Sequence, residues 1–242
     1  MKIKTLRRHD AFYLNENRYK KTKEVFRFVG DKIIKFKKKK NKKISIADFG
    51  CANGEFQYYL YRVFKGDDIF GYDSLNKLLI KAKKKVPQVK FKNGSILNKK
   101  ACAKNSFDVT TAIGVLSIFD SFEETIDNLI YWTKPGGKIL LQALLNDYPL
   151  DINIKYSHSK NWKYEKPKFW ESGWNVYSKA TIEKYLIKKK VKNFTFNKFT
   201  LKSNLKKRED SLRSWTINLN GKKVLTNGLN FAQHHSIIEI DL

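Results

Sequence analysis

The chain has 242 residues, of which 41% are hydrophobic and 14% aromatic, so it carries enough apolar material for one sizeable core. No stretch approaches the roughly 20 uninterrupted apolar residues of a membrane span, and the basic start of the chain lacks the apolar segment of a secretory signal. The two cysteines, Cys51 and Cys102, exclude a disulfide framework and a zinc cluster. We therefore expect a soluble, cytoplasmic, globular protein with no metal site and no membrane span.

The charge is strongly basic: 50 Lys and Arg residues against 23 Asp and Glu residues give a formal net charge of +27. Such an excess favours polyanion partners such as RNA, or phosphorylated small molecules. The alternative is that a low-GC genome places lysines on solvated surfaces, where they need no ligand. The densest run, Lys35–Lys43, is expected to be a solvated linker before the first strand, with a polyanion contact as the other interpretation.

Apolar runs and helical patterns alternate from residue 44 to residue 145, after a helical pattern over residues 10–35. The predicted strands are Ile44–Phe49, Ile69–Tyr72, Val89–Phe91, Phe107–Ile113 and Lys138–Leu145. The predicted helices are Gly54–Phe64, Leu75–Lys84 and Phe122–Trp132. This alternation, with nearly continuous apolar strands, predicts an α/β fold whose mostly parallel sheet has helices on both faces.

The flanking segments differ from this pattern. Residues 146–177 are rich in aromatic side chains and irregular, and Ser178 is expected to cap a helix that runs to Lys189. The end of the chain is strand-like, with a hairpin turn expected at Asn220–Gly221. We therefore expect an N-terminal helical region and basic linker over residues 1–43. One domain would follow over residues 44–242, with residues 146–177 as an insertion.

A glycine-rich loop follows the first predicted strand. Gly50, Ala52 and Gly54 open a helix there, which lets the backbone turn tightly and approach a ligand. Asp73 ends the next strand 19 residues after Gly54, close to the roughly 20 residues expected for an acid that binds a ribose. Asp48 precedes the first glycine and would repel a pyrophosphate, but it suits a ligand that carries an ammonium and a sulfonium group.

The spacing Asp48-x-Gly50-x-x-x-Gly54 resembles the first motif of class I S-adenosylmethionine (SAM)-dependent methyltransferases. The later segments that match this family occur in its order between residues 44 and 199: Asn93–Ile96, Phe107–Leu116, Trp132–Lys138 and Tyr177–Leu186. The resemblance implies a Rossmann-like sheet of seven strands, with an N-terminal helical lid, C-terminal β-hairpin additions and SAM as the cofactor. It also makes residues 146–177 the insertion that builds the acceptor site.

The resemblance also implies roles for single residues. The backbone of Gly50–Gly54, with Cys51 and Ala52, would face the methionine part of SAM, and Asp48 would lie near its ammonium group. Asp73 would hold the ribose. The remaining cofactor-binding residues would be Ser74 and Leu75 beside the adenine, Ser95 and Ile96 flanking it, and Ile113 and Gly114 over the methionine. Many family members carry an acid at the position of Ser95. Cys51 is expected to pack rather than to act as a nucleophile.

The methyl acceptor is less constrained. Ala112–Ser117 lacks the Asn/Asp-Pro-Pro-Tyr/Phe motif of enzymes that methylate exocyclic amines of bases, and Ser117 or Ile118 stands where many O-methyltransferases carry a His. The candidate catalytic residues therefore come from the flanks: His158, Asp147 and Tyr19. The candidate acceptor-binding residues are Tyr13, Arg18 and Asn146. Ordinary packing or solvation remains the alternative for each of them.

These patterns predict a SAM-dependent methyltransferase that methylates an oxygen of a small, anionic acceptor, such as a sugar, a nucleotide-sugar or a phosphate-bearing precursor. With its trailing hairpins, the whole chain also resembles methyltransferases encoded with bacterial capsule or O-antigen sugar genes, which implies a role in surface polysaccharide synthesis. Two alternatives stay open. The first is an RNA methyltransferase, supported mainly by the net charge. The second is a protein that binds SAM without turnover.

Overall fold

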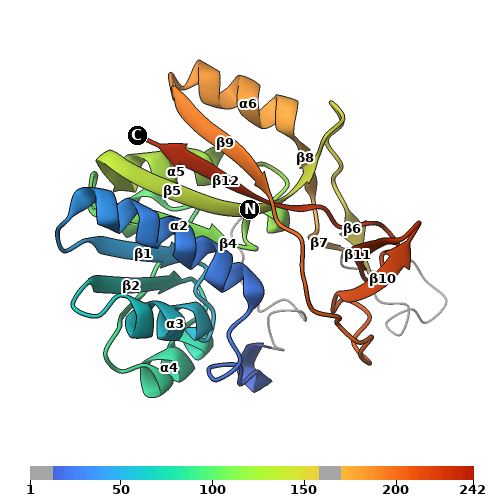
Figure 1. The fold of residues 1–242 in the computed structure, drawn as a ribbon, viewed down its shortest axis with the longest axis horizontal. Coiled ribbons are helices and arrows are strands. Elements are labelled where there is room, and N and C mark those ends of the chain that lie inside the picture. Colours follow the sequence, from blue (N-terminus) through green and yellow to red (C-terminus); the bar gives the residue numbers. More distant parts are fainter. Residues whose placement is uncertain (1–12, 158–169) are drawn as a thin grey trace.

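A sheet forms the centre of the computed structural model, which describes residues 13–157 and 170–242 (Figure 1). Seven strands follow the order β3-β2-β1-β4-β5-β12-β9, and the short β8 pairs with the end of β5. The eight strands of this sheet are β1 (Ser45–Phe49), β2 (Asp68–Asp73), β3 (Lys90–Asn93), β4 (Phe107–Ile113), β5 (Thr133–Asn146), β8 (Val176–Ser178), β9 (Asn193–Lys198) and β12 (His235–Asp241). Strands β1 to β5 are parallel, whereas β12 is antiparallel to β5 and β9. The expected Rossmann-like, mostly parallel sheet is confirmed.

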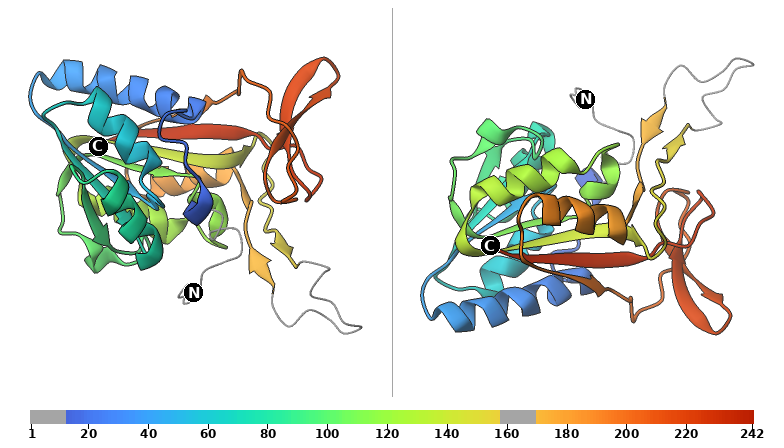
Figure 2. Two further views of the ribbon diagram at one scale, coloured as in Figure 1. Left: turned by 90° about the horizontal axis from the view of Figure 1, so that it is seen from below. Right: turned by 90° about the horizontal axis from the view of Figure 1, so that it is seen from above.

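Helices cover both faces of this sheet (Figure 2). One face carries α2 (Glu24–Lys40), α3 (Glu55–Val63) and α4 (Asn76–Lys85), and the other carries α5 (Glu123–Trp132) and α6 (Lys179–Lys188). Two short 3-10 turns span Lys99–Ala101 and Leu116–Ile118. Because side chains of a strand alternate between faces, Leu140 and Ile237 join the core under α2 and α3, whereas Leu141 and Ile238 join the core under α5 and α6.

An aromatic stack fixes the strand ends that lead into the glycine-rich loop. The Phe49 ring lies between Tyr72 and Trp132, with centroid distances of 4.9 Å and 4.2 Å. Each ring of this size buries about 150–250 Å². Since Phe49 directly precedes Gly50, and Tyr72 precedes Asp73, this stack holds the two loops of the expected cofactor site in a fixed relation.

The lysine run that was expected to be a linker belongs to a helix. α2 continues to Lys40, and Asn41 ends it in the left-handed conformation with φ of 47°. Lysine is a good helix former, and cations in the last turn interact favourably with the helix dipole, so the run continues the helix as far as Asn41. α2 also packs with Val29 and Ile33 into the same core as β1 and α3, across the boundary expected at residue 43.

Two strand pairs and α6 complete the fold. Ser178 caps α6 as expected, because its hydroxyl accepts a hydrogen bond from the Ala180 amide at 3.1 Å. β6 (Lys155–Tyr156) pairs with β7 (Glu171–Ser172), and β10 (Trp215–Leu219) pairs with β11 (Lys222–Thr226) through the expected turn at Asn220–Gly221. Both pairs lie beyond the ends of the parallel strands, at the right of Figure 1. Within the described residues, no helix combines the length and the apolar character needed to cross a bilayer.

Candidate active site

The loops that carry the predicted cofactor residues gather at one edge of the sheet, where β1 to β5 end; we call it the carboxyl edge. Gly50–Gly54 follow β1, Asp73–Leu75 close β2, Ser95–Ile96 follow β3, and Ile113–Gly114 close β4. The strand order reverses between β1 and β4, since β2 and β3 lie on one side and β5 on the other. Ligands of open α/β sheets bind at such a switch point.

The glycine-rich loop needs its glycines. Gly50 and Gly54 have φ of 81° and 83°, which side chains with a Cβ rarely adopt. A Cβ on Gly50 would lie 2.4 Å from Cγ2 of Val115, so the loop after β1 and the loop after β4 touch directly at this point. The amides of Gly50 and Cys51 both donate to the Tyr72 carbonyl, at 2.8 Å and 3.0 Å. The loop is therefore held against the end of β2.

Asp73 is oriented by the backbone around it. Its carboxylate is buried and accepts hydrogen bonds from the Ala52 amide at 2.8 Å and the Leu75 amide at 2.9 Å. These bonds bring the carboxylate to the glycine-rich loop, where the sequence places the ribose. A carboxylate has about four lone-pair positions, so the same group can also accept from hydroxyls.

Asp48 lies beneath the loop on the face of α2 and α3. Its two oxygens accept from Nε2 of Gln57 at 2.8 Å and from the Thr111 hydroxyl at 2.7 Å. Burial raises the pKa of Asp48 to about 7, and the nearby Asp73 carboxylate adds to this effect. The Gln57 amide oxygen is also buried and has no hydrogen-bond partner among the described residues. An ammonium group would satisfy both sites, which fits the expected ligand.

The other predicted cofactor residues differ in burial and in hydrogen bonding. Ser74 is exposed, and the Ser95 hydroxyl accepts from the Leu97 amide at 3.2 Å. Ile96 is buried in the core under α5. Burial raises the pKa of Cys51 well above its ordinary value, so its thiol is not activated as a nucleophile.

Residues 13–23, which we call the strap, run from the first described residue to α2 and bind to the glycine-rich loop. The Tyr19 hydroxyl donates to the Asn53 carbonyl at 2.6 Å, and the Asn53 amide nitrogen donates to the Tyr13 carbonyl at 3.1 Å. Nζ of Lys81 donates to the Leu14 and Glu16 carbonyls, both at 2.6 Å. The strap is thus tied to both α3 and α4 beside the carboxyl edge.

The C-terminal addition reaches the same strap. Arg213, just before β10, forms an ion pair with Glu16, and its guanidinium lies 5.5 Å from the centre of the Tyr13 ring. Arg18 also pairs with Glu16, and its amide donates to Glu55 at 2.8 Å. Two segments far apart in the sequence therefore meet at the carboxyl edge.

The described candidates for catalysis and acceptor binding lie on two segments: Tyr13, Arg18 and Tyr19 on the strap, and Asn146 and Asp147 at the end of β5. Burial raises the pKa of Tyr19 to about 12, which does not favour a role as a base at neutral pH. Asp147 is exposed and pairs with Lys179 at 2.5 Å, which lowers its pKa. Asn146 binds within its own loop, where its side chain donates to the Leu150 carbonyl at 3.1 Å. His158 lies outside the described residues.

Sequence reasoning missed a polar pair at the carboxyl edge. Nε2 of Gln142, on β5, lies 3.0 Å from Nδ1 of His235, on β12. Burial lowers the pKa of His235 to about 4, with a smaller contribution from His234. One signal was present, because Gln142 is the polar residue within the apolar run Ile139–Leu145.

A model of the protein family described as "Methyltransferase domain" matches residues 21–189, which is more than half of the chain. The chain belongs to this methyltransferase family. S-adenosylmethionine is accordingly its cofactor, and the glycine-rich loop, Asp73 and the acceptors around Asp48 fit that group.

Curated relatives of this methyltransferase act on different acceptors. It is 30% identical over 130 residues to tRNA U34 carboxymethyltransferase of Helicobacter acinonychis, covering 48% of each chain. It is 27% identical over 122 residues to malonyl-[acyl-carrier protein] O-methyltransferase of Priestia megaterium, covering 50% of this chain and 44% of the relative. The chain thus matches about half the length of these relatives.

Solved structures show the same fold. The PH0226 protein of Pyrococcus horikoshii has a TM-score of 0.55 at 14% identity, with 96% of this methyltransferase and 98% of that chain covered. The YcgJ protein of Bacillus subtilis has a TM-score of 0.52 at 14% identity, with 81% and 91% covered. At this identity the likeness concerns the fold alone.

Proposed function

We propose that this methyltransferase binds SAM between the glycine-rich loop and Asp73 and methylates an oxygen of a small, anionic acceptor. SAM supplies a methyl group on a cationic sulfur; the methyl carbon passes to the acceptor oxygen while the carbon–sulfur bond breaks and leaves a neutral thioether. The Gly50–Gly54 backbone would face the methionine, with Asp48 and Gln57 near its ammonium group. Ser74, Leu75, Ser95 and Ile96 would surround the adenine, and Ile113 and Gly114 would cover the methionine.

The contacts that join the strap to the glycine-rich loop and to the C-terminal addition carry the proposal of a small acceptor. The strap is tied to the glycine-rich loop by Tyr19 and Asn53 and to the C-terminal addition by Glu16 and Arg213. An edge bounded by two such segments suits a small molecule better than a folded polymer. Tyr13, Arg18 and Asn146 would line this acceptor side.

The state of Tyr19 and Asp147, the two expected catalytic residues that the structure describes, supports an acceptor that is already ionised. The Tyr19 phenol has a raised pKa, and the Asp147 carboxylate is paired with Lys179. A hydroxyl acceptor must lose a proton, so a base helps its methylation, whereas a carboxylate or phosphate oxygen needs none. A phosphate-bearing precursor, a nucleotide-sugar or a carboxylate meets this condition. A capsule or O-antigen sugar is a narrower form of the same proposal, and it rests on the sequence resemblance alone.

Calorimetric titration with SAM tests the cofactor site. Replacing Asp73 with Asn removes the charge that would strengthen the hydrogen bonds to the ribose, so we expect SAM to bind about 10- to 100-fold more weakly. Asp108→Asn is the matched control, because Asp108 is also a buried carboxylate but lies at the opposite end of β4, paired with Lys134. Equal losses in both variants would contradict the proposed site. SAM binding without any methylated product would favour the non-enzymatic alternative.

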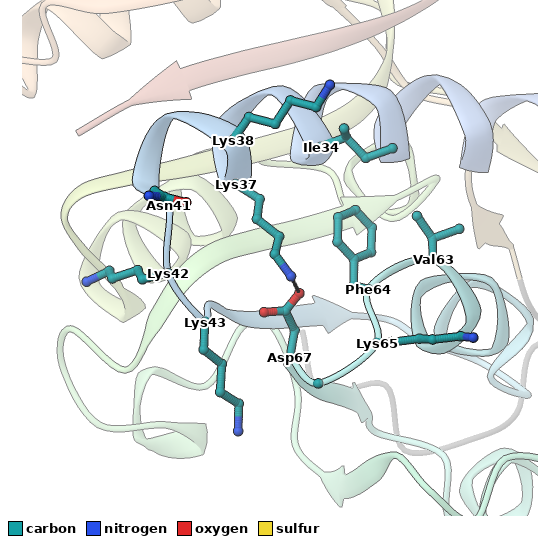
Figure 3. A pocket seen from close by; sticks show the side chains of 11 residues that line it. Ile34, Lys37, Lys38, Asn41, Lys42, Lys43, Val63, Phe64, Lys65 and Asp67 are labelled. Carbon is teal, nitrogen blue, oxygen red and sulfur yellow. Dashed lines mark hydrogen bonds and ion pairs between the residues drawn. The ribbon is translucent and has the colours of Figure 1, made fainter.

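A basic groove favours RNA methylation as a second candidate. A cavity of about 690 Å³ lies between the end of α2 and the turn before β2, and Figure 3 shows Lys38, Lys42, Lys43 and Lys65 around it. No acidic side chain of the described residues pairs with Lys38, Lys42 or Lys65, whereas Lys37 is held by Asp67 and Lys43 by Asp68. The groove lies where β1 and β2 begin, at the edge opposite the carboxyl edge. An RNA would therefore have to reach around the sheet to be methylated.

A further inference from the structure

The pair formed by Gln142 and His235 is placed beside the proposed methyl-transfer site. The backbone of Gln142 pairs with Ile113 at the end of β4, and Oε1 of Gln142 lies 4.0 Å from the position that a Cβ on Gly114 would occupy. Gly114 is exposed and has φ of 72°. The proposed function, on which this inference rests, puts the methionine end of SAM at Ile113 and Gly114.

The pair faces the same side of the sheet as the polar groups around Asp48. Alternation along β5 and β12 puts Gln142 with Leu140 and His235 with Ile237, whose side chains lie in the core under α2 and α3. Asp48 lies on this face too, since it binds Gln57 of α3. Asp48 is level with Leu140 of β5 through Thr111 of β4, so Gln142 lies one side-chain position nearer the carboxyl edge on the same face.

The hydrogen bond between the two side chains determines which groups they offer. The nitrogen of a glutamine amide only donates, so Nδ1 of His235 must accept, and the proton of the neutral ring then lies on Nε2. Neither Nε2 of His235 nor Oε1 of Gln142 has a hydrogen-bond partner among the described residues, and neither atom is a fully buried unpaired group. The pair thus presents a carbonyl acceptor beside Gly114 and, on the neighbouring strand β12, an N–H donor.

We infer that His235 binds the methyl acceptor through an oxyanion group, a carboxylate or a phosphate, to which its Nε2–H donates. Gln142 is the positioning residue, because its amide nitrogen fixes the ring in the tautomer that carries this proton. Methylation of such an oxygen forms one oxygen–carbon bond, breaks one carbon–sulfur bond and moves no proton. A donor rather than a base is therefore the group that this reaction needs.

Nitrogen NMR of histidine-labelled protein tests the inference. The protein is saturated with S-adenosylhomocysteine and titrated with acetate in one arm and with inorganic phosphate in the other; His235→Phe assigns the signals. We expect Nε2 of His235 to be protonated before titration and to shift with one of the two anions, which identifies the oxyanion. His235→Gln, which keeps an N–H donor, should retain most of the anion affinity, whereas His235→Phe should lose at least about tenfold.

Gln142→Glu provides the decisive variant. A glutamate of the same shape can only accept from the ring, so Nδ1 should carry a proton. In the neutral ring Nε2 is then unprotonated, and the anion response should disappear. An unchanged tautomer in this variant, or an unchanged anion response in His235→Phe, would overturn the inference. Calorimetry with SAM shows whether the cofactor site is intact, because SAM should bind His235→Phe and His235→Gln within about twofold of the parent. Failure of the parent to bind SAM would instead refute the proposed function.

Discussion

Asp48 makes the stability of this methyltransferase depend on pH. Burial raises its pKa to about 7 from 3.8, so between about pH 4 and pH 7 the folded state binds a proton that the unfolded state has released. The contribution of Asp48 to stability is therefore full below pH 4 and is lost as the pH rises to 7, by at most about 1.4 kcal/mol per pH unit.

Asp48→Asn removes this dependence. We expect the free energy of unfolding in guanidinium to fall between pH 5 and pH 7 in the parent, by about 2–3 kcal/mol more than in the variant. Comparing the two proteins cancels the titration of other groups that they share. Parallel curves for parent and variant would show that the carboxyl group is already ionised at pH 5.

Gly50 is predicted to tolerate no side chain while Val115 is present. In Gly50→Ala the new methyl group would strain the backbone at φ of 81° and overlap Cγ2 of Val115, and we expect a loss of roughly 2–4 kcal/mol in the free energy of unfolding. Val115→Ala removes Cγ2 and relieves the overlap but not the backbone strain. In the Val115→Ala background, Gly50→Ala should therefore reduce the free energy of unfolding by about 1 kcal/mol less than in the parent, and a double-mutant cycle measures this difference. Strictly additive losses would mean that the two loops do not touch.

Single residues were predictable from the sequence where the signal was local. Gly50, Gly54 and Asp73 follow from the spacing between two strands, and the structure brings them to one edge. The pair of Gln142 and His235 depends on two strands 93 positions apart, whose pairing no local pattern specifies. Only the isolated polar residue in β5 pointed to it.

At the level of elements, Lys81 is predicted to hold the strap. Its ammonium group donates to the Leu14 and Glu16 carbonyls, so Lys81→Met should release the strap while the apolar stem of the side chain is kept. We expect limited trypsin digestion to cut at Arg18, Lys20 or Lys21 several times faster in the variant. The melting temperature should change little, because the strap contributes little to the two cores.

Lys84→Met is the matched control, since Lys84 lies on the same helix, is exposed and forms no ion pair with the described residues. Digestion at the same rate in both variants would show that Tyr19 and Asn53 suffice to hold the strap.

Helices and strands were largely predictable because their apolar periodicity is local. β4 spans the predicted residues, and α5 and α6 differ from the prediction by one residue at an end. The helical pattern was expected over residues 10–35, but α2 spans Glu24–Lys40. The prediction ended too early because a run of lysines occurs both in helices and in linkers. The position of the strap was not predictable, since its contacts are mostly to carbonyl groups, which every residue has.

For the molecule as a whole, the net charge of +27 has two explanations: binding of RNA, or lysines that only solvate the surface. Variants of the basic groove distinguish them. If the groove binds RNA, the affinity for a single-stranded oligonucleotide should fall steeply with salt, because each contacted phosphate releases a counterion. Replacing Lys38, Lys42 and Lys65 with Gln should then reduce the slope of log affinity against log salt concentration by about 2, at roughly 0.7 per contact.

A second triple variant that removes the same charge elsewhere distinguishes binding in the groove from a general effect of surface charge. Lys184, Lys192 and Lys222 are exposed on α6, on the segment after it and on β11, away from the groove. Their replacement with Gln should leave the slope nearly unchanged if the groove is a specific site. Equal reductions in both triple variants would mean that the lysines act only through the net charge. RNA methylation would then lose the one structural feature that favours it over a small acceptor.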